Sequence, residues 1–124
     1  MAAVVSGHYG GRTTYGEREE DTMKDERLLC DMTADEQMIR RIVRHYGQED
    51  QLSQAMEEAG ELITAISHYR RRRKGSRREL LEEMADMQIM LRQLQLITGA
   101  GSEELEALEH RKLLRQAERM RSRD

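Results

Sequence analysis

The sequence predicts an all-α protein, and three observations support this prediction. Proline, phenylalanine and tryptophan are absent and tyrosine occurs only 4 times, so the residues that usually build and interrupt β-sheets are scarce. Hydrophobic residues make up 37% of the 124 positions and charged residues 36%, a balance typical of amphipathic helices. Thr33 and Ser76 each lie three residues before a glutamate and ahead of a periodic apolar segment, as in helix capping boxes. We therefore expect a single helical domain.

Four helices are expected, at about 34–46, 49–74, 77–98 and 103–121. The first and third follow the two capping boxes, Thr33 with Glu36 and Ser76 with Glu79, in which each side chain would satisfy a free backbone N–H. Glycines or a capping serine mark the remaining boundaries: Gly47, Gly75, Gly99, Gly101 and Ser102.

Residues 1–32 are expected to form a flexible acidic arm, and residues 33–124 to form the helical domain. The arm holds seven acidic and four basic residues, so it accounts for the net charge of −3 and leaves the domain neutral. Its single cysteine, Cys30, is interpreted as an inert thiol. No apolar run could span a bilayer, and the chain does not open with a secretory signal pattern. We therefore expect a cytoplasmic protein without a membrane partner.

Four acidic residues of the two central helices lie on or beside apolar surface. On a helical wheel Glu58 borders the apolar face of helix 49–74, and Glu61 adjoins it one turn later. Glu83 and Asp86 lie within the apolar surface of helix 77–98. Packed face to face, the two helices would bring these carboxylates together, and a hard cation such as Mg²⁺ or Mn²⁺ would then be needed. Salt bridges to the abundant arginines are the alternative.

The order and spacing of these acids resemble a known enzyme family. Glu57-Glu58-Ala59-Gly60-Glu61, followed after 21 residues by Glu83-Met84-Ala85-Asp86, resembles the EExxE and ExxD motifs of MazG-like all-α nucleoside triphosphate pyrophosphatases, in their compact phage and bacterial branch. The flanking residues 51–56, 62–66 and 82–91 look similar as well, so the resemblance covers about 34–121.

The resemblance implies a function and a role for each residue. Such enzymes use Mg²⁺ to hydrolyse a nucleoside triphosphate between the α and β phosphates, commonly to remove unwanted nucleotides, and they form homodimers or homotetramers. The implied metal ligands are Glu58, Glu61, Glu83 and Asp86, and the candidate catalytic acids are Glu57 and Glu61. Lys112, Arg115 and Arg119 resemble the family's basic tail and are the candidate triphosphate contacts, either in their own subunit or in a neighbouring one.

Seven positive charges between Arg70 and Arg78 suggest a second function, a non-catalytic helical module that binds nucleic acid or regulates a partner. The preferred interpretation of this run is a solvated helix end whose cations favour the helix dipole. Nucleic acid is considered an improbable partner, because the domain is neutral and aromatic residues are scarce. Helix 77–98 is apolar around nearly its whole circumference, so we expect oligomerisation to complete its covering.

Overall fold

The computed structural model describes residues 32–123, and this part of the chain contains four α-helices and no strand. The helices are α2 (Ala34–Tyr46), α3 (Gln48–Arg70), α4 (Ser76–Thr98) and α5 (Ser102–Arg121). The all-α prediction is therefore confirmed for these residues. Residues 1–31 of the predicted arm, including Cys30, lie outside the described residues.

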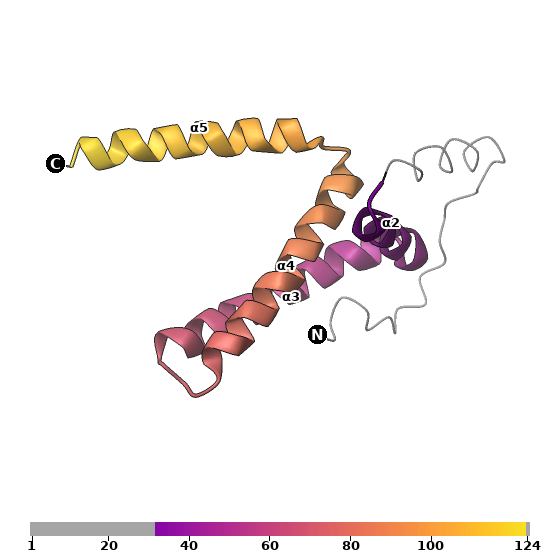
Figure 1. The fold of residues 1–124 in the computed structure, drawn as a ribbon, viewed down its shortest axis with the longest axis horizontal. Coiled ribbons are helices and arrows are strands. Elements are labelled where there is room, and N and C mark those ends of the chain that lie inside the picture. Colours follow the sequence, from indigo (N-terminus) through magenta and orange to yellow (C-terminus); the bar gives the residue numbers. More distant parts are fainter. Residues whose placement is uncertain (1–31, 124) are drawn as a thin grey trace.

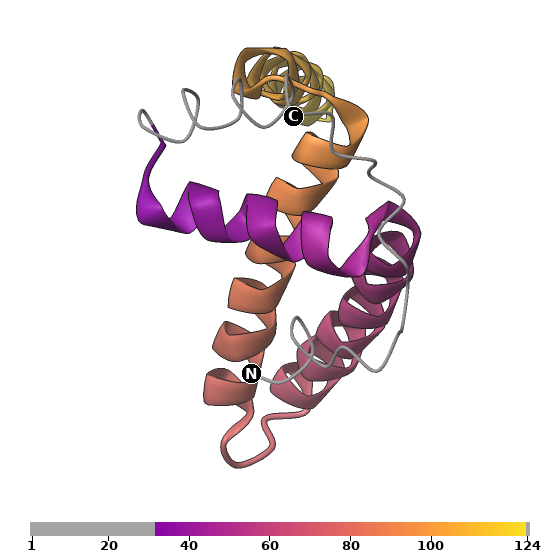
Figure 2. The ribbon, with the colours of Figure 1, turned by 90° about the vertical axis from the view of Figure 1, so that its right-hand side faces the viewer.

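The centre of the fold is an antiparallel hairpin formed by α3 and α4, which pack along each other more extensively than any other pair of helices. α2 crosses both helices toward the end opposite their connecting turn (Figures 1 and 2). α5 extends away from the hairpin (Figure 1), and none of its side chains is buried. Within the described residues, no helix is both long enough and apolar enough to cross a membrane.

One of the three predicted serine or threonine caps is confirmed. The Glu36 N–H donates to Thr33 Oγ1 at 3.2 Å and the Thr33 N–H donates to Glu36 Oε2 at 3.1 Å, so α2 begins with a complete capping box. The predicted Ser76 capping box is wrong. The N-cap of α4 is Gly75, with φ 75°, because the Glu79 carboxylate accepts a hydrogen bond from His68 Nδ1 instead of returning to the helix start.

The fourth helix likewise begins one residue earlier than predicted. Gly101, in an extended conformation, is the N-cap of α5, and Ser102 is the first helical residue. Ser102 is therefore not a cap, and no side-chain hydrogen bond caps this helix.

The end of α3 also differs from the prediction, which placed it at 74 with Gly75 as the stop. The Arg72 N–H donates to the Tyr69 carbonyl at 2.9 Å, and the Arg73 N–H donates to the His68 carbonyl at 3.1 Å. These two hydrogen bonds form a Schellman motif, in which Arg72 takes the left-handed position with φ 57°. α3 therefore ends at Arg70, and the residues from Arg71 to Lys74 lie in the turn rather than in a helix.

Gly99 ends α4 by the same motif and was predicted correctly. Its φ is 70°, its N–H donates to the Leu96 carbonyl, and the Ala100 N–H donates to the Gln95 carbonyl. Glycine adopts this left-handed conformation most readily, because in other residues the Cβ atom would crowd the backbone.

The apolar core of one chain is small. The buried hydrophobic residues within the described part are Ile39, Val43, Ala55, Ala65 and Met90. α4 is not covered on all sides, since Leu81, Met84 and Leu91 remain 42%, 45% and 48% exposed. A single chain therefore leaves much of the apolar surface of α4 in contact with water.

Candidate metal centre

The buried face of α3 is unusually polar at the point where it meets α4. Gln51, Gln54 and Glu58 recur at spacings of three and four residues, so they lie along one side of the helix, and all are buried. Glu58 is completely buried, at 0% exposed, and Gln54 Nε2 donates to its Oε1 atom at 3.0 Å. This hydrogen bond satisfies one carboxylate oxygen and fixes the carboxylate against α4.

α4 contributes two further carboxylates to the same place. Asp86 is 2% exposed and Glu83, one turn earlier, is half-buried. One oxygen atom from each of Glu58, Glu83 and Asp86 can be chosen so that all three lie within 4.8 Å of one another. The two helices therefore bring together three of the four acids that the sequence analysis selected as metal ligands.

Oxygen atoms of this three-acid cluster lack partners within the described residues. Glu58 Oε2, Glu83 Oε2 and Asp86 Oδ1 are buried and accept no hydrogen bond. Nor does an arginine or lysine of the described part pair with these three carboxylates, so the salt-bridge alternative is not realised there. Buried charged oxygens without partners are costly, and a bound cation would satisfy them.

The electrostatics of the cluster agree with this geometry. Burial raises the pKa of the Glu58 carboxyl from its usual 4.5 to about 7. The hydrogen bond from Gln54 opposes the rise, while the negative charges of the neighbouring acids, Glu61 foremost, add to it. Burial also raises the pKa of Glu83 and of Asp86, and the negative charge of Glu61 raises both further. Each carboxyl thus holds its proton more tightly than it would in water.

The donor set suits a hard divalent cation. Mg²⁺ is commonly held by a few carboxylates while it keeps several waters, and Mn²⁺ accepts the same oxygen ligands. Glu58, Glu83 and Asp86 offer three carboxylates with orphaned oxygens, which is enough for such a site. The cation would supply positive charge to neutralise phosphate oxygens and to acidify a bound water.

The remaining predicted site residues lie outside this cluster. Glu61 is exposed at its rim, where its charge acts on all three acids although it is not one of the three close ligands. Glu57 is exposed on α3, so its side chain does not enter the buried cluster. Lys112, Arg115 and Arg119 are exposed on α5, which leaves the hairpin, so one chain does not bring them to the acids (Figure 1).

The sequence analysis missed the buried glutamines that accompany the acids. Gln54 precedes Glu58 by four residues on the same helical face, and that spacing was a readable signal for a positioning hydrogen bond. Gln93 on α4 is 0% exposed and donates from Nε2 to Met90 Sδ at 3.6 Å, while its Oε1 has no partner within the described residues. Both helices of the hairpin, α3 and α4, therefore contribute buried glutamines to its core.

Comparison of the chain with protein-family models, with curated proteins and with solved structures found no match.

Proposed function

We propose that this protein is a nucleoside triphosphate pyrophosphohydrolase that requires Mg²⁺, or Mn²⁺ in its place, and acts in the cytoplasm to remove unwanted nucleotides. The observation that carries the proposal is the cluster of Glu58, Glu83 and Asp86, with buried oxygens that lack partners and with raised pKa values. The same residues stand in the order and spacing of the MazG-like motifs, which gives the cluster a specific chemistry.

In the proposed reaction a water molecule attacks phosphorus and the bond to the bridging oxygen between the α and β phosphates breaks. The products are a nucleoside monophosphate and pyrophosphate. Glu58, Glu83 and Asp86 would hold the cation, and Glu61 at the rim would complete its ligands or orient the water. Glu57, exposed one residue before Glu58, is assigned to orienting the water or to a further cation.

The triphosphate needs positive charge that the hairpin does not place near the acids. Lys112, Arg115 and Arg119 follow one another at spacings of three and four residues, so they share one side of α5. Leu113 and Met120 project from a different side and are 61% and 57% exposed. We propose a homodimer or homotetramer in which these apolar residues pack on a neighbouring subunit and the basic side reaches a neighbour's acids.

Pyrophosphate release from a panel of ribo- and deoxyribonucleoside triphosphates tests the enzymatic proposal. We expect release by the wild type that requires Mg²⁺, and loss of release in Glu58→Gln and in Asp86→Asn. Glu106→Gln, which removes an exposed carboxylate on α5, is the matched control and should retain activity. A folded wild type that releases no pyrophosphate from any nucleotide with Mg²⁺ or Mn²⁺ would contradict the proposal.

Light scattering tests the oligomer separately from the activity. A stable species with the mass of one chain would rule out the shared site. Exchange of Leu113 for Glu should dissociate the assembly, whereas the same exchange of Gln116, another exposed residue of α5, should leave it intact.

A further inference from the structure

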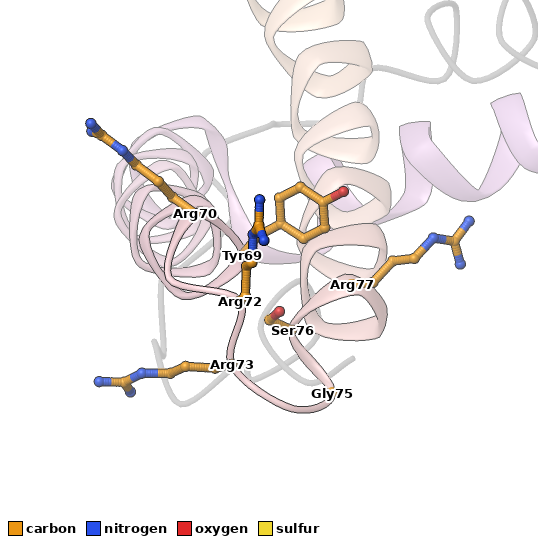
Figure 3. A pocket seen from close by; sticks show the side chains of 7 residues that line it. All are labelled: Tyr69, Arg70, Arg72, Arg73, Gly75, Ser76 and Arg77. Carbon is orange, nitrogen blue, oxygen red and sulfur yellow. The ribbon is translucent and has the colours of Figure 1, made fainter.

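The turn between α3 and α4 carries a second concentration of charge, at the end of the hairpin rather than at the acid cluster. We call residues 70–78 the basic turn. An open pocket of about 590 Å³ lies there, lined by four arginines, a tyrosine, a glycine and a serine (Figure 3): Tyr69, Arg70, Arg72, Arg73, Gly75, Ser76 and Arg77. Three of these arginines, Arg70, Arg73 and Arg77, extend in different directions from the turn (Figure 3).

Within the described residues, Arg78 is the one arginine of the basic turn that pairs with an acid, and the four arginines that line the pocket form no ion pair. The two acids that follow it are engaged, since Glu79 pairs with His68 at 2.9 Å and Glu82 pairs with Arg78 at 3.0 Å. Neither acid contacts Arg70, Arg72, Arg73 or Arg77. A compact set of cations without counter-charges repels itself, and an external anion would relieve that repulsion.

A serine lies among these cations. Ser76 lines the pocket although the residue is only 5% exposed, and its hydroxyl forms no side-chain hydrogen bond within the described part of the chain. In Figure 3 the hydroxyl points toward the side of the pocket where Tyr69 lies. Ser76 is also the first residue of α4. Its own N–H donates to the Arg73 carbonyl at 3.1 Å, and the N-cap Gly75 offers no side-chain acceptor to the N–H groups of Arg77 and Arg78.

The charges at this helix end are arranged against the usual preference. The N-terminus of a helix carries a partial positive charge and favours acidic side chains, yet Arg77 and Arg78 lie in the first turn of α4 beside Glu79, whose carboxylate is turned to His68. Arg71 is the C-cap of α3 and the residues 72–74 lie just past it, exposed, so the interpretation of a solvated helix end stays compatible with this part of the run. Backbone N–H groups, a serine hydroxyl and arginine side chains together form a phosphate-binding arrangement.

We propose that the basic turn binds single-stranded nucleic acid, with one phosphate at Ser76 and the N-terminus of α4. Adjoining phosphates contact the arginines on either side, and a base stacks on Tyr69, whose side chain is 51% exposed. A strand fits better than a single phosphate because the arginines extend in different directions over the turn (Figure 3). A membrane fits less well, because residues 70–78 contain no apolar side chain that could insert between lipids.

Fluorescence anisotropy with a labelled oligothymidylate of about ten nucleotides, measured in EDTA, tests this proposal. If about four phosphates are contacted, log affinity should fall against log salt with a slope of about −3, which is roughly a 50-fold loss between about 50 and 200 mM salt. Arg72→Gln combined with Arg77→Gln should weaken binding about tenfold and make the slope less steep by about 1.4. Tyr69→Ala should weaken binding at least about fivefold and leave the slope unchanged.

Two controls separate this binding from the proposed catalysis. Arg41→Gln removes an exposed arginine of α2 and should leave oligonucleotide binding unchanged. Glu58→Gln should also bind the oligonucleotide like the wild type, while Arg72→Gln with Arg77→Gln should still release pyrophosphate. Failure of the enzymatic proposal therefore leaves this one standing, and the reverse is also true.

Three results would overturn the proposal. The first is that the wild type does not bind the oligonucleotide at low salt. The second is that the wild type and the folded double variant bind it equally well. The third is that the protein binds only vesicles of phosphatidylserine and phosphatidylcholine. The last result would identify an anionic membrane surface as the partner instead.

Discussion

Replacement of Glu58 by glutamine, in the absence of divalent cations, should stabilise the folded protein at neutral and alkaline pH. Glu58 is 0% exposed, its Oε2 has no partner, and other acids of the hairpin surround it. Glutamine has the same shape and removes the charge. Its own Oε1 can still accept the hydrogen bond from Gln54 that now reaches Glu58 at 3.0 Å.

The expected magnitude follows from the raised pKa. Between pH 4.5 and about 7 the folded protein keeps the Glu58 proton while the unfolded chain has released it. The free energy of unfolding therefore decreases as the pH rises through this interval and is constant above it. The rise in pKa from 4.5 to about 7 corresponds to roughly 3 kcal/mol, which is fully present below pH 4.5 and fully lost above about pH 7. The raised pKa values of Glu83 and Asp86 contribute in the same direction.

Urea unfolding of the wild type and of Glu58→Gln, at several pH values from about 5 to 8 in EDTA, measures this difference. The variant should gain about 2.5 kcal/mol relative to the wild type as the pH rises from about 5 to 8. Glu106→Gln, on the exposed surface of α5, should follow the wild type. Added Mg²⁺ at about a hundred times its dissociation constant should restore about 2.7 kcal/mol to the wild type at pH 8 and much less to Glu58→Gln. Equal pH dependence in wild type and variant would refute the argument from buried charge.

Three further predictions concern the stability of the helical fold, and urea unfolding monitored by circular dichroism measures all of them. Thr33→Ala removes the capping box of α2 and should cost about 1 kcal/mol, whereas Thr33→Ser should cost much less. Arg72→Gly should stabilise the protein by about 1 kcal/mol because Arg72 has a φ of 57°, while Arg73→Gly, at ordinary φ, should destabilise it; the opposite order would contradict the Schellman assignment. Met90→Ala should cost about 3 kcal/mol because Met90 is 0% exposed, and a loss below about 1 kcal/mol would show that this core is loosely packed.

Helix ends could be predicted from the sequence where they depend only on hydrogen bonds between residues that are close together in the chain. The α2 capping box and the glycine end of α4 depend only on neighbouring residues, and both were predicted correctly. The start of α4 depends on a tertiary contact, because His68 of the preceding helix takes the Glu79 side chain. The end of α3 at Arg70 requires an arginine in a left-handed conformation, which residue preferences argue against.

The candidate site could likewise be predicted only in part. Helical periodicity was enough to place Glu58 and Asp86 on the faces that become buried against each other. Glu61, three residues after Glu58, shares its side of α3 but is exposed at the rim, and helical periodicity alone could not distinguish these two positions. The position of α5 could not be predicted, because its direction depends on the short connection between Gly99 and Gly101 and not on a buried face of its own.

The acid cluster and the basic turn lie on the same two helices, yet their charges should act almost independently. Arg77, the unpaired cation of the turn that is nearest to Glu83 along α4, lies six positions before it, which is about 9 Å along the helix axis. The screening length at physiological ionic strength is about 8 Å, so the exposed arginines of the turn are largely shielded from the acids. The acids themselves are shielded less because they are buried, and neutralising them therefore requires a ligand within the hairpin rather than a distant positive charge. For this reason the basic turn does not substitute for a cation at Glu58, and a variant of one site is a valid control for the other.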